Sequence, residues 1–422
     1  MDQFLKWVQS KGITHDRAQL KKISDDTGYG LFCSQDTPEP STMVHIPSSL
    51  LITSTLALQV SPAFRDTLKQ HFDLSLDVLS LAEQRQVLTL FLVYCQYINQ
   101  NTIWSDYLSI LPPVQFFEDH HVLFQPHLLE GTSLWHAVRA KLARLEQVHA
   151  SLSIDWLSQV TLPMLLWADA VLWSRVVEIE PDQLALIPFF DFANHSQTPN
   201  LRWERSSNGI VLVNTEAVGA DQELMLSYGS KPNQELLFIH GFCIPNNSVV
   251  SVVSLPCMPF FVNDPPRALW LRQTTPQSTL RLGLTDNERE GIERAGWDWT
   301  SMMIMYLAVL DSDEVEMAFT ENGLELEGQT VTSLSELEQV VRSFEYFPVI
   351  QLRAIVLLIQ ALEYQLEQAS PITNHTSPLS SQVAIYQTEE QQIIHRSLEV
   401  LTELQSQLMT DPVVQAFLQA NS

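Results

Sequence analysis

Two sets of short strand-like runs stand on either side of a long helical stretch, and this order limits the folds open to the chain. Between about residues 61 and 174 apolar side chains recur at the spacing of helices, as at Leu88, Phe91 and Cys95. Strands are predicted where β-branched and apolar runs are bounded by turn residues. They are Gly28–Cys33 and Met43–Ile46 before the helical stretch, and Leu184–Ile187, Gly209–Asn214 and Glu223–Tyr228 after it. The sequence therefore predicts an α+β fold in which a helical segment interrupts a β-fold.

The last third of the chain is predicted to be mainly α-helical. Long helical patterns occupy Leu334–Gln368 and Leu379–Leu408. The acidic segment Asp311–Glu327 is predicted as a solvated loop or helix face. At the other end, residues 1–12 are predicted to form a short amphipathic helix that ends at Gly12. A length of 422 residues exceeds one ordinary core, so we expect more than one domain.

The net charge limits the partners that the chain can bind. Asp and Glu number 49 against 23 Lys and Arg, which gives a formal net charge of −26, and the sequence has no basic patch. Such a surface would repel phosphate backbones, so direct nucleic-acid binding is not expected. A basic protein partner would be attracted. An acidic surface also keeps a protein soluble, and the composition leaves both readings open.

Cysteine spacing and hydropathy indicate an intracellular protein. The four cysteines lie far apart without a CxxC pair, which favours free thiols in a reducing compartment. Residues 1–13 hold no long apolar run of the kind found in secretory signals. Asp169 and Arg353 interrupt the most apolar stretches, which are shorter than the ~20 residues of a membrane span. We therefore expect a cytoplasmic or nuclear protein with no membrane partner.

The segment Ile187–Ser196 is the most informative motif, because an apolar run leads directly into Asp191 and the triplet Asn194-His195-Ser196. It resembles the Asn-His-Ser signature of SET-domain methyltransferases, in the form typical of the branch related to Rubisco large-subunit methyltransferase. Further segments resemble the same family in the expected order. They are the glycine-rich Thr27–Leu31, Trp167–Arg175 with its Ser-Arg end, the tyrosine segment Glu223–Gly229, Asn233–Leu237, Gly241-Phe242 and the downstream Tyr386–Ile394.

This resemblance implies a fold, a cofactor and an activity. The expected fold is a SET-type β-fold with a helical insertion, followed by a mainly α-helical substrate-binding domain. The SET domain would span 1–245 with its insertion at about 60–170, the linker 246–265 and the C-terminal domain 266–422. The implied activity is methyl transfer from S-adenosylmethionine to a lysine of another protein, by a monomeric enzyme. No cysteine-rich zinc segment of histone-directed SET domains is present, so we expect a non-histone substrate, such as a ribosomal protein or translation factor.

The family's functional positions fall on particular residues of this chain. Tyr228 is expected where the methyl donor and the acceptor nitrogen meet. It would orient these groups and not remove a proton, because a phenol with a pKa near ~10 stays neutral. Arg175, His240 and Phe242 are expected to bind the substrate. The expected cofactor-binding residues are Thr27, Gly28, Tyr29, Gly30, Ser174, Asp191, Asn194 and His195, together with Tyr228.

Two positions depart from the family pattern. Pro40-Ser41 stands where many relatives have a Gly-Glu turn, and His240 stands where many have a second tyrosine. Some relatives methylate histidine, so a histidine acceptor is one alternative to lysine. A non-catalytic binding protein that keeps the fold is the other. No metal site is expected, because no HExxH or carboxylate pattern accompanies His120, His121, His127 and His136.

Overall fold

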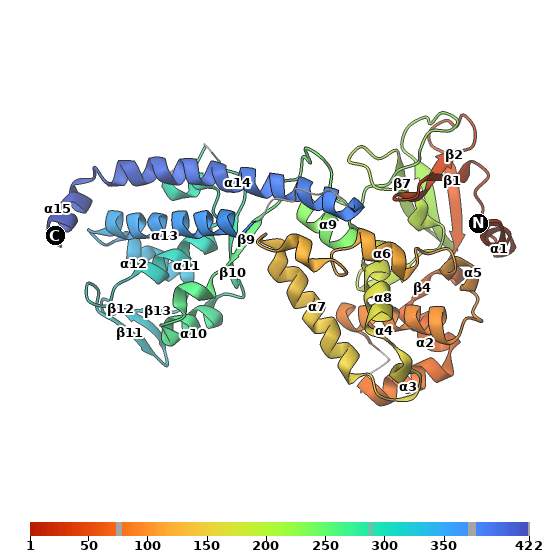
Figure 1. Cartoon of the computed structure of the whole chain (residues 1–422), viewed down its shortest axis with the longest axis horizontal. Helices are drawn as coiled ribbons and strands as arrows, with labels where there is room; N and C mark the ends of the chain where they lie inside the picture. Colours follow the sequence, from red (N-terminus) through yellow and green to blue (C-terminus); the bar gives the residue numbers. More distant parts are fainter. Residues whose placement is uncertain (73–77, 287, 290, 370–376, 421–422) are drawn as a thin grey trace.

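Two hydrophobic cores organise the computed structural model, which describes residues 1–72, 78–286, 288–289, 291–369 and 377–420. The first core draws on residues between Phe4 and Cys243 and on the start of the helix α14 (Pro378–Leu408), and the second draws on residues between Val253 and Leu404. Each core forms one lobe of an elongated molecule, with the two chain ends at opposite ends of its long axis (Figure 1). The predicted arrangement of a SET-type β-fold with a helical insertion and a mostly helical C-terminal region is confirmed. The boundaries at 245 and 266 stay predictions.

The first lobe is built on small antiparallel sheets. The hairpin β1–β2 stands by itself, β8 lies between β3 and β7, and β6 lies between β4 and β5. Four of the five predicted strands are present, with shifted ends at β3 and β6. The bounds are β1 (Ala18–Ser24), β2 (Gly28–Cys33), β3 (Thr42–Pro47), β4 (Ile52–Thr53), β5 (Val176–Glu180), β6 (Gln183–Leu186), β7 (Leu201–Ser206) and β8 (Gly209–Asn214).

The predicted strand Glu223–Tyr228 is wrong. This segment makes only isolated bridges, Phe32 to Glu223 and His195 to Leu226. Besides scattered backbone bonds, the side chain of Asn200 takes the place of a strand neighbour at Glu223 and Met225. The amide of Asn200 donates to the Glu223 carbonyl at 2.8 Å and accepts from the backbone N–H of Met225 at 2.8 Å. The segment is extended, but its backbone is held by neighbours that the alternation of apolar residues does not reveal.

The inserted helices pack against the sheets as one layered block, as expected from the spacing of their apolar residues. The second half of α4 and the middle of α8 are buried, and α7 packs against α8. The helix α9, which follows the tyrosine segment, packs on α7 and α8. The bounds are α1 (Asp2–Ser10), α2 (Ser54–Val60), α3 (Pro62–Phe72), α4 (Leu81–Val93), α5 (Ser105–Leu108), α6 (Val114–His120), α7 (Leu134–Ser151), α8 (Leu162–Arg175) and α9 (Asn233–His240).

The C-terminal lobe differs from its prediction at two places. The pattern Leu334–Gln368 is two helices, because Pro348 lacks an N–H and favours a helix start. The acidic segment Asp311–Glu327 contains two paired strands with Leu324 and Leu326 in the core, so it is not a plain loop or helix face. The bounds are β9 (Val253–Pro256), α10 (Pro265–Thr274), β10 (Thr279–Leu282), α11 (Trp299–Val309), β11 (Met317–Thr320), β12 (Gly323–Leu326), β13 (Gln329–Val331), α12 (Leu334–Arg342), α13 (Phe347–Gln368), α14 (Pro378–Leu408) and α15 (Pro412–Ala420).

Length and composition would allow one described helix, α13, to cross a membrane. It packs instead against α11 and α14, and Ile350, Leu358 and Leu362 are fully buried in the second core. A long apolar helix at the centre of a core has the same composition as a membrane span. The packing therefore accounts for its apolar residues.

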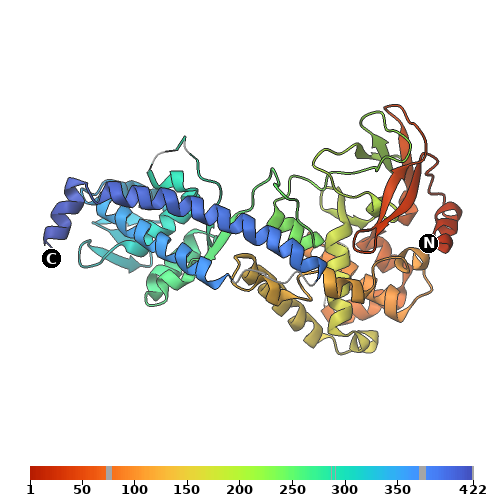
Figure 2. The same ribbon diagram turned by 45° about the horizontal axis from the view of Figure 1, so that its top comes forward.

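The helix α14 belongs to both cores. Its first turns place Leu379, Val383 and Tyr386 in the first core, and its second half places Leu401 and Leu404 in the second. At about 1.5 Å per residue, its 31 residues span about 45 Å, and Figure 2 shows it running along both lobes. The two lobes are therefore held by one continuous helix.

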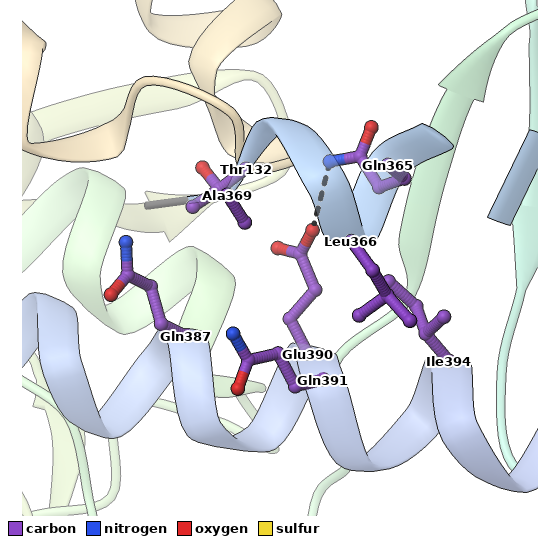
Figure 3. Close-up of a pocket in the computed structure, with 8 residues that line it drawn as sticks. All are labelled: Thr132, Gln365, Leu366, Ala369, Gln387, Glu390, Gln391 and Ile394. Carbon is purple, nitrogen blue, oxygen red and sulfur yellow. Dashed lines mark hydrogen bonds between the residues drawn. The ribbon is translucent and has the colours of Figure 1, made fainter. Parts of the chain in front are cut away.

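Polar contacts at Gly131 strengthen the junction between the lobes. Gln365 of α13 donates to the Gly131 carbonyl at 2.7 Å and to the buried Glu390 of α14 at 3.3 Å; Figure 3 shows the second of these bonds. Gly131 has φ +81°, and a Cβ there would lie 2.1 Å from the carbonyl oxygen of Gln368. A side chain at this position would therefore push α13 away from the insertion.

We predict that Gly131→Ala lowers the midpoint of thermal unfolding more than the matched control Gly328→Ala. Gly328 also has positive φ, at +70°, but a Cβ there would meet no atom within 4 Å. The control should lose only the about 1–2 kcal/mol of a left-handed alanine, and Gly131→Ala about 3 kcal/mol or more. Scanning calorimetry measures both. Equal midpoints for the two variants would contradict the tight contact between the lobes.

Candidate active site

Three segments that lie far apart in the sequence meet at the edge of the first lobe. The extended segment 223–228 lies between β2 and residues 194–196. The backbone N–H of Leu224 donates to the carbonyl of Leu31 at 2.7 Å, and that of Leu226 donates to the carbonyl of Asn194 at 2.9 Å. The N–H of Ser196 donates to the carbonyl of Leu226 at 2.8 Å. These bonds bring the Asn-His-Ser triplet and the tyrosine segment together.

The glycine-rich hairpin is joined to this assembly through Glu223. The side-chain amide of Asn194 donates to Glu223 Oε1 at 2.8 Å. The same carboxylate oxygen would lie 2.9 Å from a Cβ at Gly30, and the side chain of Ile23 would lie at 2.7 Å. A side chain at position 30 would therefore displace the ends of Ile23 and Glu223. Gly30 thus leaves the Glu223 carboxylate in place for its contact with Asn194.

Tyr228 is held by two hydrogen bonds to residues of the 191–196 loop. Its hydroxyl donates to the carbonyl of Ala193 at 3.0 Å, and its backbone N–H donates to His195 Nδ1 at 3.0 Å. Because Nδ1 accepts, the proton of the neutral His195 ring is on Nε2. Burial raises the pKa of Tyr228 to about 12. The phenol therefore stays neutral, and its oxygen keeps lone pairs free to accept contacts.

Aromatic rings pack against the ring of Tyr228. The ring of His195 lies 5.1 Å from that of Tyr228, and the ring of His240 lies 5.0 Å from it on another side. Phe242 lies 5.9 Å from His240 and 6.4 Å from His195. His240 Nε2 is buried and has no hydrogen-bond partner among the described residues. The four rings form an aromatic wall with one unused imidazole nitrogen.

A buried ion pair lies beside this wall. Arg175 Nε lies 3.1 Å from Asp191 Oδ2, and the hydroxyl of Tyr107 donates to the same oxygen at 2.7 Å. Burial raises the pKa of Asp191, while Arg175 and Tyr107 oppose that shift. The side chain of Ser174 donates to the carbonyl of Ala170 at 2.7 Å and accepts from Arg175 Nη1 at 2.8 Å. Ser174 therefore fixes the guanidinium at the end of α8.

The loop that carries Asp191 is strained and braced. Phe189 has φ +74°, a conformation that costs about 1–2 kcal/mol for a residue with a side chain. Its ring is buried, 6.4 Å from Phe4 of α1 and 6.2 Å from Phe192. The N-terminal helix thus covers the loop from outside. Backbone strain held by such packing is common at binding sites.

These groups suit the amino-acid end of S-adenosylmethionine. Asp191 Oδ1 is buried without a hydrogen-bond partner among the described residues, and Arg175 Nε makes only the ion pair with Asp191 Oδ2. A carboxylate acceptor and a guanidinium donor match an ammonium and a carboxylate. Buried polar atoms without partners are uncommon and call for a ligand or water. Asp191, Arg175 and Asn194 would therefore hold the amino-acid end of the cofactor, and its methyl group would lie toward Tyr228.

The structure gathers most of the residues predicted from the sequence. Gly30 and Asn194 meet at Glu223, Ser174 and Arg175 meet Asp191, and His195, His240 and Phe242 surround Tyr228. Thr27 lies in the turn of the hairpin, and Gly28 and Tyr29 are the first residues of β2. In the same turn, Asp26 Oδ1 lies 3.4 Å from His120 Nε2. Their roles in binding stay predictions, as do those of the other residues. Sequence reasoning missed Tyr107, Glu223 and the Ala193 carbonyl.

Signals for the missed residues are weak. Tyr107 is one aromatic residue in the helical insertion, and nothing in its spacing relates it to Asp191 across the chain. The alternation of apolar residues marks Glu223 only as the start of a strand. A backbone carbonyl such as that of Ala193 carries no residue signature at all. Only the fold brings these groups to the site.

Comparisons with known proteins agree with this geometry. The SET domain family model matches residues 28–229. "SET domain-containing protein 8" of Schizosaccharomyces pombe is 33% identical over 149 residues, covering 33% of this chain and 34% of that protein. "N-lysine methyltransferase setd6" of Danio rerio is 22% identical over 282 residues, covering 58% of each chain. The chain thus spans about a third of the length of the first relative and under three-fifths of the length of the second.

A solved structure extends the likeness to both lobes. The crystal structure of the SET domain of LSMT bound to lysine and AdoHcy superposes with a TM-score of 0.73 and 15% identity, covering 96% of this chain and 92% of that one. At this identity the likeness shows the fold. It includes the helical C-terminal lobe as well as the sheets.

We predict that His240→Phe weakens the loss of stability in mild acid. Burial, together with the charges of Lys231, Arg175, His195 and His121, lowers the pKa of His240 from 6.5 to about 3. Below pH 6.5, His240 is protonated in the unfolded chain but stays neutral in the folded chain. The free energy of unfolding therefore falls as pH drops from 6.5 toward 3. At about pH 5 this one group costs about 2 kcal/mol.

Thermal unfolding of both proteins at about pH 7.5 and about pH 5 measures this effect. The drop in midpoint should be smaller in His240→Phe than in the wild type, and it should persist in part because His121 and His195 also have lowered pKa values. The exposed His395 provides the control His395→Phe. A drop that is as large in His240→Phe as in the control would show that His240 is not held neutral.

Proposed function

Because residues 28–229 form a SET domain, we propose that this chain is an S-adenosylmethionine-dependent protein-lysine N-methyltransferase. The observation that carries the proposal is the hydrogen bond from the Tyr228 hydroxyl to Ala193, which fixes the phenol beside the buried pair Asp191 and Arg175. The names of an N-lysine methyltransferase relative and of a lysine-bound structural neighbour support the reaction.

The site supplies the conditions that methylation of an amine requires. Bound S-adenosylmethionine would supply a methyl group on a positively charged sulfur, and the acceptor must present a nitrogen lone pair in line with that carbon–sulfur bond. A free lysine with a pKa near ~10.4 is almost wholly protonated at neutral pH and cannot attack. Burial beside His195, His240 and Phe242 removes water from an amine, and a positively charged methyl donor nearby would repel an ammonium, so both lower the pKa of an amine bound there. No strong base is needed once the amine has lost its proton to water.

Tyr228 acts by position. Its hydroxyl proton is used in the bond to the Ala193 carbonyl, so the oxygen presents lone pairs to the reacting carbon. Weak contacts from the polarised methyl hydrogens to that oxygen align the methyl group. His195 holds the backbone of Tyr228 and so fixes the direction of the phenol. Alignment of this kind is a large part of the rate gain in a displacement reaction.

The acceptor is proposed to be a lysine of a non-histone protein with a basic surface. The formal charge of −26 would attract such a partner and repel nucleic acid. All four cysteines are free and buried, which supports a site of action in the reducing cytoplasm or nucleus. We further propose that the enzyme acts as a monomer, at no membrane, and that the target is a ribosomal protein or a translation factor.

Two other readings are separated by the same experiment. A histidine acceptor would leave a methyl group on an imidazole, and a non-catalytic binding protein would transfer none. We therefore propose labelled methyl transfer from S-adenosylmethionine into a cell lysate, with mass spectrometry of the modified residue. Methyl-lysine supports the proposed function. Methyl-histidine replaces it by the first alternative, and absence of any label overturns it.

We predict that Tyr228→Phe lowers the rate of methyl transfer at least about tenfold, because the alignment of the methyl group by the hydroxyl is lost. S-adenosylmethionine binding, measured by calorimetry, should change much less, since Asp191, Arg175 and Asn194 remain. Tyr364→Phe is the matched control, because its side chain is 63% exposed on α13. A rate unchanged from that of the control would remove the role assigned to Tyr228.

A further inference from the structure

A groove of about 320 Å³ lies at the junction of the two lobes. One wall is formed by residues 385–396 of α14, and the other by the start of α9 and residues 245–250 of the loop that follows it. Leu284 of the C-terminal lobe also lines the groove. Its floor is partly apolar, from Val250, Ile385 and Ile393. Such a mixed lining suits an extended peptide, whose backbone needs polar partners and whose side chains need apolar ones.

Glu389 fixes the two walls of this groove to each other. From α14 its Oε2 accepts from Asn233 Nδ2 at 2.8 Å, and its Oε1 accepts from the backbone N–H of Ser251 at 2.9 Å. The next residue, Glu390, points to another side of the helix and accepts from the backbone N–H of Ser133 at 2.9 Å. Adjacent carboxylates thus bind α14 to α9 and to the insertion. The groove is therefore formed before any partner binds.

Asn247, which lines the groove, also contacts the two segments that carry the candidate active site. Its Nδ2 donates to the carbonyl of Lys231 at 3.0 Å, and its Oδ1 accepts from Gln197 Nε2 at 2.6 Å. Lys231 follows Tyr228 by three residues, and Gln197 follows the Asn-His-Ser triplet. A chain that placed its lysine beside Tyr228 would therefore leave the site next to this groove.

The electrostatics of the groove differ from those of the rest of the surface. Both oxygens of Glu389 are used within the protein, as described above. Arg396, about two turns further along α14, is exposed in the lining and forms no ion pair with a described carboxylate. On a chain with a formal charge of −26, this cation has no internal partner in its groove. It offers a fork of donors to a carboxylate from outside.

We propose that this groove binds the segment of the substrate protein that flanks the acceptor lysine, and that Arg396 pairs with an acidic side chain in that segment. The inference rests on the proposed function and adds a rule for choosing among lysines. The overall negative surface gathers a basic protein, while Arg396 selects a lysine with an acidic neighbour. The groove requires that neighbour at a fixed number of residues from the lysine, since its walls are rigid.

The test uses the full chain and fluorescent peptides with a central lysine, in which one Glu replaces one Gln at each position in turn. Fluorescence anisotropy gives binding, and labelled methyl transfer is measured on the same peptides. At one position Glu should strengthen binding about two- to fivefold over Gln, the range of an exposed ion pair. In Arg396→Glu this preference should reverse, and Lys should be favoured there.

Arg272→Glu is the matched control, since it makes the same charge change at an exposed arginine of α10, outside the groove. It should keep the wild-type preference. Binding that is equal for Glu and Gln at every position, or a preference that survives Arg396→Glu, would overturn the inference. The readouts are independent. A preference that depends on Arg396, without methyl transfer to any peptide, would support the groove and count against the proposed function alone.

Discussion

The site depends on how the backbone of residues 223–228 is held without a regular sheet. On one side it bonds to β2, and on the other it bonds to Asn194 and Ser196, so that Tyr228 reaches the carbonyl of Ala193. Each of these bonds is between segments separated by many residues. A shift of one residue in this pairing would turn Tyr228 away from the pocket. The chemistry proposed for the chain is therefore a consequence of register.

The helix α14 likewise joins parts of the chain that lie far apart in the sequence, on the scale of the two lobes. One helix that is buried at its start in the first core and at its end in the second makes the lobes a single framework. The buried Glu390 is tolerated because Ser133, Tyr386 and Gln365 surround its carboxylate. Burial raises the pKa of Glu390 because it disfavours the charged carboxylate, and the surrounding hydrogen-bond donors offset part of this cost. The shape of the groove beside Asn247 is set by how α14 packs against the first lobe.

Much of the fold could be predicted because local patterns agree with it. The strand Gly28–Cys33 and the helix pattern at Leu379–Leu408 have the periods of their structures, and the Asn-His-Ser triplet marks the site. The segment 223–228 could not be predicted, because Asn200 supplies bonds that a strand neighbour would otherwise make. The contact of Tyr107 with Asp191 joins residues 84 positions apart and leaves no local signal. Sequence indicates which groups are present, and tertiary packing decides which of them meet.

The most direct measurement of the central claim is a crystal structure of the chain with S-adenosylhomocysteine. We expect one ligand per chain, with its amino-acid end at Asp191, Arg175 and Asn194 and its sulfur toward the hydroxyl of Tyr228. The unused atom Asp191 Oδ1 should then have a partner. A ligand bound elsewhere, or a Tyr228 hydroxyl turned away from the ligand, would contradict the account.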